Sequence, residues 1–198
     1  MRLAFGLFAG CALCFAQAAP VAIETPASGK DPALFERADN GWAQGMHPAD
    51  RFMKNTHEIL SPLNEITGKM PMTHHEFLTA DRKAQRSVFS DGTRTVEVVV
   101  NMGDAPLQWT SKMGGAIELP VYGFLVESPD FVAFRARTWS GRRYTAAPIF
   151  TLRSLDGQPL AQSRRIRIFH ASGDAELLFR GSTRTVAKEA VVELPALQ

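Results

Sequence analysis

The 198-residue sequence is poor in cysteine, in tyrosine and in net charge. It has two cysteines, two tyrosines and a formal net charge of +2 at pH 7. Both cysteines, Cys11 and Cys14, lie close to the N-terminus, so the rest of the chain has no disulfide and depends on its core for stability. A charge this close to neutral lacks the basic surface on which general nucleic-acid binding depends, and it excludes nucleic acid as a partner.

Several common signatures of chemistry are also missing. The sequence has neither a glycine-rich phosphate loop nor a Gly-x-Ser-x-Gly elbow, and no Ser-His-Asp triad can be assigned from spacing. No segment after the N-terminal leader is apolar enough to cross a membrane. The sequence therefore gives no reason to expect a cofactor or a transmembrane segment after the leader.

The leader itself has the features of an export signal. Arg2 precedes an uncharged apolar run from Leu3 to Phe15, and the following Ala16-Gln17-Ala18 has the small-x-small pattern that signal peptidase recognises. We expect residues 1–18 to be a signal peptide, cleaved after Ala18, and the protein to be secreted or periplasmic. Two alternatives stay open: an uncleaved anchor, and lipid attachment at Cys11.

The next part of the chain is expected to be helical. Residues 19–30 are rich in Pro, Ala, Ser and Gly and are interpreted as a flexible lead-in, and residues 31–81 as a helical segment and linker. Asp31 is a good cap for a helix from Pro32 to Asn40, and a second helix begins at Pro48. Its buried face is predicted from apolar residues at helical spacing: Phe52, Thr56, Ile59, Leu60, Leu63 and Ile66. Pro62 predicts a kink or a break into two short helices.

From Arg82 onward the hydrophobic period changes to two. The alternating sets are Val96, Val98 and Val100; Tyr122, Phe124 and Val126; Val132, Phe134 and Ala136; Ile166, Ile168 and His170; Leu177 and Phe179. Glycine-containing turn signals separate most of them, which is typical of a sandwich or barrel. We therefore predict a mainly β fold, an antiparallel β-sandwich over residues 82–198, preceded by one or two short helices.

Several phrases between Met53 and Tyr144 carry a family resemblance. They read KNTHEILSPL (54–63), MTHHEFLT (72–79), QRSVF (85–89), VVVN (98–101), LPVYGFLVESP (119–129) and FVAF (131–134). With them, roughly half of the chain resembles the C-terminal end of large secreted glycoside-hydrolase-like proteins. In those proteins a catalytic (β/α) barrel runs through its last helix into a β-sandwich.

The resemblance implies an accessory domain in a carbohydrate-processing context, structural or carbohydrate-interacting. The helix around Asn55–Leu63 would be the last barrel helix. The catalytic barrel is missing, because the stretch between the leader and the first expected strand is too short to hold the barrel strands and their two carboxylates. No catalytic residue carries over, and we expect no independent catalysis. An alternative is a glycoside hydrolase whose barrel is on another chain and docks on the apolar face of the helix from Phe52 to Ile66.

Aromatic side chains are the first candidates for a sugar site, because the apolar face of a pyranose lies flat on an aromatic ring. We predict a carbohydrate-binding set of Trp139, Trp109, Tyr144 and Arg142, with Tyr122 as a further aromatic of the same kind. Trp139 stands beside a Ser140-Gly141 turn among arginines, which are planar hydrogen-bond donors. The competing interpretation is that Trp139 is a core residue and that the arginines form a solvated strand face.

The densest polar cluster suggests a metal site. Met72, His74 and His75 are the predicted ligands, because thioether and imidazole suit copper in an exported protein, and histidines with Glu76 suit zinc. A periplasmic metal-binding protein is therefore a second alternative. Adjacent histidines on an extended chain point to opposite sides, so the competing interpretation is a linker in which the Met side chains pack and the His side chains bond to the backbone.

Acids near the helix–sheet junction are weaker candidates. A pair among Glu58, Glu65, Glu76 and Asp81 would serve as general acid and base if held about 5–10 Å apart in a cleft, whereas surface or capping acids are far commoner. His170 follows two inward-facing residues by alternation. We expect it to be a hydrogen-bonded core residue.

Overall fold

The computed structural model describes residues 48–195. This range forms one helix, α3 (Pro48–Thr67), and fourteen strands. The strands are β1 (Met72–Phe77), β2 (Ala84–Ser90), β3 (Thr95–Asn101), β4 (Leu107–Ser111), β5 (Gly115–Leu119), β6 (Gly123–Glu127), β7 (Phe131–Arg135), β8 (Thr138–Trp139), β9 (Arg142–Arg143), β10 (Ile149–Ser154), β11 (Arg165–Ser172), β12 (Glu176–Phe179), β13 (Ser182–Thr185) and β14 (Glu189–Glu193). The expected signal peptide, the lead-in, the helix from Pro32 and the candidate lipidation site Cys11 lie outside the described residues.

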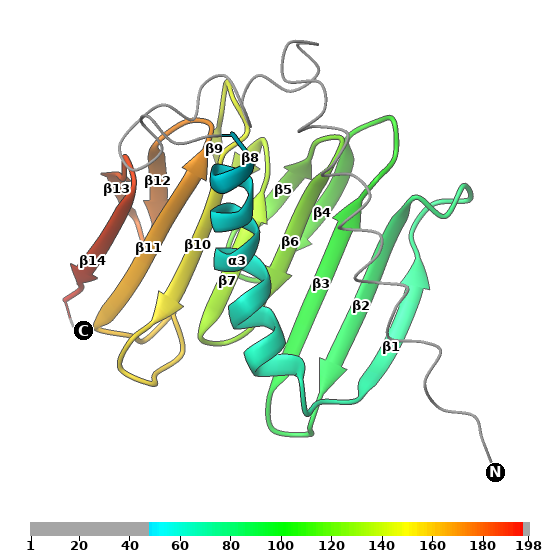
Figure 1. Cartoon of the computed structure of the whole chain (residues 1–198), viewed down its shortest axis with the longest axis horizontal. Coiled ribbons are helices and arrows are strands. Elements are labelled where there is room, and N and C mark those ends of the chain that lie inside the picture. Colours follow the sequence, from blue (N-terminus) through cyan, green and yellow to red (C-terminus); the bar gives the residue numbers. More distant parts are fainter. Residues whose placement is uncertain (1–47, 196–198) are drawn as a thin grey trace.

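Eight strands form one antiparallel sheet in the order β1-β2-β3-β6-β7-β10-β11-β14 (Figure 1). Because neighbours alternate in direction, β3, β7 and β11 all run the same way and finish at the same end of the sheet. The connection after each of them contains a two-stranded ribbon: β4–β5, β8–β9 and β12–β13. The three ribbons fold over one face and form a second layer.

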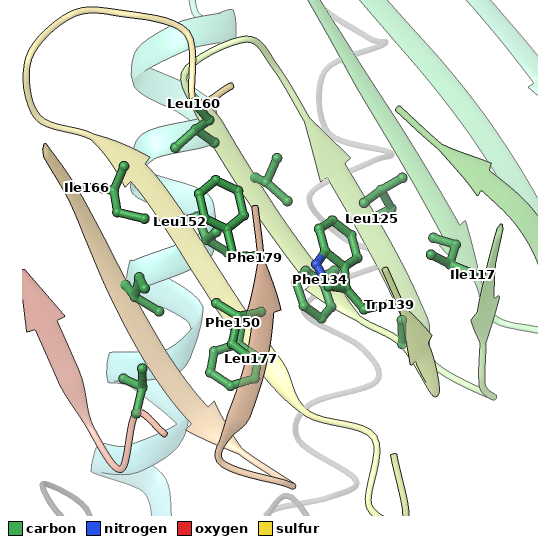
Figure 2. Packing of buried hydrophobic residues seen from close by; sticks show 14 of the residues in the cluster. Ile117, Leu125, Phe134, Trp139, Phe150, Leu152, Leu160, Ile166, Leu177 and Phe179 are labelled. Carbon is green, nitrogen blue, oxygen red and sulfur yellow. The ribbon is translucent and has the colours of Figure 1, made fainter. Parts of the chain in front are cut away.

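The larger hydrophobic core lies between the sheet and the ribbons (Figure 2). Trp139 of β8 stacks on Phe134 of β7, with ring centroids 4.0 Å apart and an interplanar angle of 6°. Ile117 of β5 and Leu177 of β12 join the same cluster, and all four side chains are fully buried. Each ribbon is too small to be stable alone, so burial of these side chains against the sheet holds the layer in place.

Helix α3 crosses the opposite face over the central strands (Figure 1). Leu63 packs with Val96, Val126 and other side chains of β3, β6 and β7, and Ile66 lies against the same cluster. Ile59 contacts this cluster and a neighbouring one that includes Phe169. The predicted mainly β fold, an antiparallel sandwich preceded by a helix, is confirmed; the second layer consists of ribbons and not of one large sheet.

Of the two outcomes predicted for Pro62, a kink or a break into two short helices, the break is wrong. α3 is one continuous helix of 20 residues with Pro62 inside it. A proline removes one helical hydrogen bond and crowds the preceding turn, which costs about 3 kcal/mol in an isolated helix. Here contacts on both sides of Pro62 keep the two halves on one sheet face: Ile59 precedes it and Leu63 and Ile66 follow it.

The sheet also begins earlier than predicted. The boundary was expected at Arg82, but β1 starts at Met72 inside the presumed linker. β1 is an edge strand, and all but one of its side chains are exposed. A strand that is solvated on both faces has no alternating hydrophobic pattern, so its sequence gave no period-two signal.

A buried ion network ties α3 to the sheet. The Glu58 carboxylate accepts hydrogen bonds from Arg167 Nη1 at 2.6 Å and Nη2 at 3.0 Å, and it is also paired with Lys54. Arg167 Nε donates to Glu189 of β14 at 2.6 Å. Burial opposes the ionisation of Glu58, but the bonds from Arg167 and Lys54 outweigh it and hold the pKa of Glu58 below its usual value of 4.5.

We expect Glu58→Ala to lower the free energy of unfolding by roughly 3 kcal/mol, because Arg167 loses the buried half of its ion pair. Urea denaturation at neutral pH measures this loss. The stability that Glu58 contributes is present above pH 4.5 and disappears as the pH falls through the lowered pKa of the folded protein, so the difference between the two proteins shrinks in acid. Glu65→Ala is the matched control, since the Glu65–Arg153 pair is exposed and contributes little. Equal effects of the two variants would contradict the assignment.

We expect Gly114→Ala to disturb the core beneath β8. A Cβ at Gly114 would lie 2.5 Å from Trp139 Cε3, and the indole is held by its stack on Phe134. Overpacking of this kind costs about 1–3 kcal/mol, and here it also changes the near-ultraviolet circular dichroism of the indole. Gly115→Ala is the control: it has open space around the new Cβ and a φ of +66°, so it loses stability through the backbone alone. An unchanged indole signal in Gly114→Ala would refute the predicted clash.

Candidate functional site

The structure buries two of the predicted sugar-binding aromatics. Trp139 has no exposed surface, and Tyr144 is 3% exposed in the same cluster. Burial raises the pKa of the Tyr144 hydroxyl to about 12. Neither ring presents a face to solvent on which a sugar can stack. Trp139 is a core residue, as the competing interpretation held.

Arg142 and Trp109 do not join one platform either. Arg142 of β9 is ion-paired with Glu176 and lies 5.7 Å from the centroid of the Tyr144 ring. Trp109 of β4 is half-buried at the margin of the core, with Arg86 of β2 over its ring at 5.9 Å. The guanidinium group occupies space beside the indole that a sugar would need.

The predicted metal ligands are also held apart. In the register of β1 with β2, His75 and His74 point to opposite faces of the sheet. His75 Nδ1 is bonded to Ser87 Oγ at 2.9 Å, while His74 Nε2 lies 3.4 Å from Glu76 Oε1. In residues 48–195 no three His, Cys, Asp or Glu side chains gather closely enough to hold a metal ion.

The four acids near the helix–sheet junction lie apart from one another, and each already has a hydrogen-bonding or ionic partner. Glu58 faces β11, Glu65 is paired with Arg153, and Glu76 is paired with Arg86 on the ribbon side of β1. Asp81 accepts from Thr79 Oγ1 and the Lys83 amide within its own turn. These bonds hold the pKa of Glu58, Glu76 and Asp81 below the usual values, and Arg86 is the main cause for Glu76.

The apolar face of α3 does not offer the docking surface that a partner barrel would require. Ile59, Leu63 and Ile66 contact the sheet. Met53 is exposed on the helix, but it stands outside the predicted face. The premise of the partner-chain alternative is therefore not met in the described part of the chain.

The aromatic side chain most exposed in residues 48–195 is Tyr122, at 58%. It lies in the turn from Pro120 to Gly123 that leads into β6, here called the Tyr122 turn. Its φ is +59°, in the left-handed region that a bulky residue rarely adopts. Glycine would fit this position without strain, so the chain keeps a large ring in solvent at an energetic cost.

Buried polar side chains from two sheet strands fix this turn. Asn101 of β3 donates from Nδ2 to the carbonyl oxygens of Leu119 at 3.1 Å and Pro120 at 3.0 Å. Arg135 of β7 donates to the Val121 carbonyl at 2.9 Å. With the bond from the Gly123 amide to the Pro120 carbonyl at 2.7 Å, the turn has little freedom to relax. Tyr122 is thus presented on a preorganised support.

One ion pair lies near the Tyr122 turn, where Lys83 is close enough to feel Tyr122 electrostatically. Asn101 Oδ1 accepts from the Gly103 amide, and Nδ2 also donates to Ala105, so Asn101 fixes the neighbouring loop that carries Asp104. Asp104 is ion-paired with Lys83 at 2.6 Å across the end of the sheet. The Asp104 carboxylate raises the pKa of Lys83, which therefore stays charged. The rim of the turn offers a cation and an anion as hydrogen-bonding groups.

A row of partly exposed side chains leads from the Tyr122 turn to the sheet edge. Phe77 of β1 is aligned with Gln85, Val100 and Phe124 across four neighbouring strands. Phe77 is 48% exposed and has Arg82 over its ring at 5.4 Å.

The sequence identified Tyr122 as a candidate aromatic but not Phe77, because β1 has no strand pattern. A tyrosine before glycine, at a position typical of a tight turn, was the available signal.

Comparison of the chain with protein-family models, with curated proteins and with solved structures gave no significant match. Within residues 48–195, no helix has both the length and the apolar character needed to cross a membrane.

His170 lies in the core as expected. Its Nε2 is 2.9 Å from the Ser172 carbonyl oxygen, and its ring centroid is 4.8 Å from that of Phe150. Burial disfavours the charged imidazolium, which lowers the pKa of His170 from its usual 6.5. A group with this environment acts in folding and not as an accessible acid or base.

We expect the folded state to lose stability below pH 6.5. In that range His170 binds a proton in the unfolded chain but stays neutral in the folded core. The loss is at most about 1.4 kcal/mol per pH unit, and it stops at the lowered pKa of the folded protein. Urea denaturation between neutral and mildly acidic pH measures it, and His170→Gln removes this part of the slope. An identical slope in His170→Gln and in the unmodified protein would exclude His170 as the cause.

Proposed function

We propose that this chain is an exported accessory β domain of glycoside-hydrolase type that contacts carbohydrate through the Tyr122 turn and does not catalyse by itself. The observation that carries the proposal is the exposed Tyr122 ring at a φ of +59° on a turn fixed by buried Asn101 and Arg135. Export rests on the signal-like leader, and the carbohydrate context rests on the resemblance given above.

The chemistry of the turn suits a sugar. A pyranose has apolar C–H groups on its face and hydroxyl groups at its rim, so it needs a flat apolar ring beside charged or polar partners. Tyr122 supplies the ring, and Lys83 and Asp104 supply a donor and an acceptor at its margin. The partly exposed row from Phe124 to Phe77 extends the surface across four strands, long enough to meet more than one sugar unit.

The ionisation of the carboxyl groups supports a role without catalysis. Glycoside hydrolysis needs a general acid that keeps its proton at working pH, which requires a raised pKa. The junction acids Glu58, Glu76 and Asp81 have lowered pKa values, because cations or hydrogen-bond donors stabilise their charged forms. Glu58 and Glu76 also lie on opposite faces of the sheet, Glu58 against Arg167 beneath the helix and Glu76 against Arg86 on the ribbon side.

We expect Tyr122→Gly to abolish glycan binding on a broad glycan array while leaving the fold as stable as before, or about 1 kcal/mol more stable, because glycine accepts a positive φ. Binding is read on the array and by calorimetry with any glycan that scores, and stability by urea denaturation. Tyr122→Phe keeps the ring and should retain most of the binding.

Two further variants locate the platform. Trp109→Ala removes the half-buried indole beside Arg86 and should leave binding intact if the Tyr122 turn is the site. Leu155→Ala removes a comparable exposed side chain from the β10–β11 turn and is the neutral control. A well-folded protein that binds no glycan, or whose binding survives Tyr122→Gly, would overturn the proposed site.

A further inference from the structure

Among the described residues, the outer side of β1 is an open strand edge. β1 stands last in the sheet order, and in residues 48–195 only β2 pairs with it (Figure 1). The Leu78 amide donates to the Ala84 carbonyl at 2.8 Å, which sets the phase of the ladder. In an antiparallel pair every second residue bonds to the neighbour, so Glu76 bonds to β2 while the N–H and C=O groups of His75 and Phe77 point outward. They form a template for another strand.

We propose that two copies of this chain associate through their β1 edges, with His75 on a two-fold axis perpendicular to the sheet. This arrangement joins two eight-stranded sheets into one continuous antiparallel sheet. His75 faces the partner's His75 as a hydrogen-bonded pair, and Phe77 faces the partner's Thr73. The bulge between Met72 and His74 ends the regular part of the edge and limits the contact to this short segment.

Charge selects this register. With His75 on the axis, each His74 stands opposite the partner's Glu76 on the ribbon side of the sheet. Within one copy, His74 Nε2 already lies 3.4 Å from Glu76 Oε1. A shift by one position of the axis would place the two Glu76 carboxylates directly opposite each other, which is repulsive. The half-exposed side chains of Met72 and Phe77 also lose solvent contact in the pair.

The other edge of the sheet has the opposite design. The Leu194 amide bonds to the Arg164 carbonyl, so the backbone groups of Glu189, Val191 and Glu193 point outward from β14. Self-pairing around Val191 would set Glu189 against the partner's Glu193, and the like charges would repel. The glutamates of β14 therefore disfavour this symmetric pairing, whereas the regular part of β1 after its bulge sets no like charges opposite each other in the proposed register.

The first experiment measures mass against concentration for the full-length chain by analytical ultracentrifugation. The contact is small, so we expect a reversible monomer–dimer equilibrium at the weak end of specific association. His75→Pro removes an outward N–H that β2 does not use, which an edge strand tolerates. It deletes two symmetry-related hydrogen bonds and should weaken the dimer about tenfold or more.

Two control variants separate the effect of losing the His75 N–H from that of losing its side chain. His75→Ala loses the bond to Ser87 Oγ but keeps the N–H group, so the dimer should persist. Val191→Pro is the same change at the centre of the protected edge and should also leave the dimer intact. A monomer at every concentration, or a dimer that His75→Pro leaves unchanged, would refute the proposal.

The second experiment tests the register by oxidation. In a background with Cys11→Ser and Cys14→Ser, His75→Cys brings two thiols into a hydrogen-bonded pair with Cα atoms about 5.5 Å apart, within disulfide range. A disulfide-linked dimer should form under mild oxidation. Phe77→Cys faces Thr73 of the other copy and should stay uncrosslinked. Crosslinking of Phe77→Cys without that of His75→Cys would exclude the arrangement.

Discussion

The central constraint on this protein is that one sheet has two apolar faces and both must be covered. β3 illustrates the demand: Val96 and Val98 are buried on the helix side and Val99 on the ribbon side. A single helix is too narrow to cover eight strands, so α3 covers the centre of one face. The three ribbons cover the other because β3, β7 and β11 finish at the same end of the sheet.

Buried polar side chains of the sheet fix the ribbon and the turn that apolar packing alone does not hold in one geometry. Glu127 of β6 accepts from Ser111 Oγ and from the amides of Lys112 and Met113, which anchors the β4–β5 ribbon. Asn101 and Arg135 anchor the Tyr122 turn in the same manner. Because a buried polar group must find its partner, each of these bonds allows one loop geometry. The rigidity of the proposed carbohydrate surface is a consequence of how the core is closed.

The two proposals depend on different principal groups, the Tyr122 ring and the outward backbone groups of β1, and they share only Phe77 at the edge of the sheet. The Tyr122 turn precedes β6, three strands away from the outer side of β1 in the sheet order. A two-fold axis perpendicular to the sheet would keep the same face of both copies on one side and place their Tyr122 turns at opposite ends. Two weak sites held apart in this way gain avidity for a long or surface-bound glycan.

The sequence by itself determined the fold class, because period-two runs with turn signals identify strands wherever one face is buried and the other is not. It also indicated the buried face of α3 at Ile59, Leu63 and Ile66. It could not reveal β1, whose side chains are solvated on both faces, nor the continuity of α3 through Pro62, which depends on contacts with strands distant in the sequence. The burial of Trp139 and the exposure of Tyr122 were likewise decided by the tertiary structure: both are aromatics beside a turn glycine, but the β8–β9 ribbon folds back onto Phe134, whereas Asn101 and Arg135 hold the Tyr122 turn in solvent. Sequence neighbours supply the residue types at a turn, and long-range packing decides which way the turn faces.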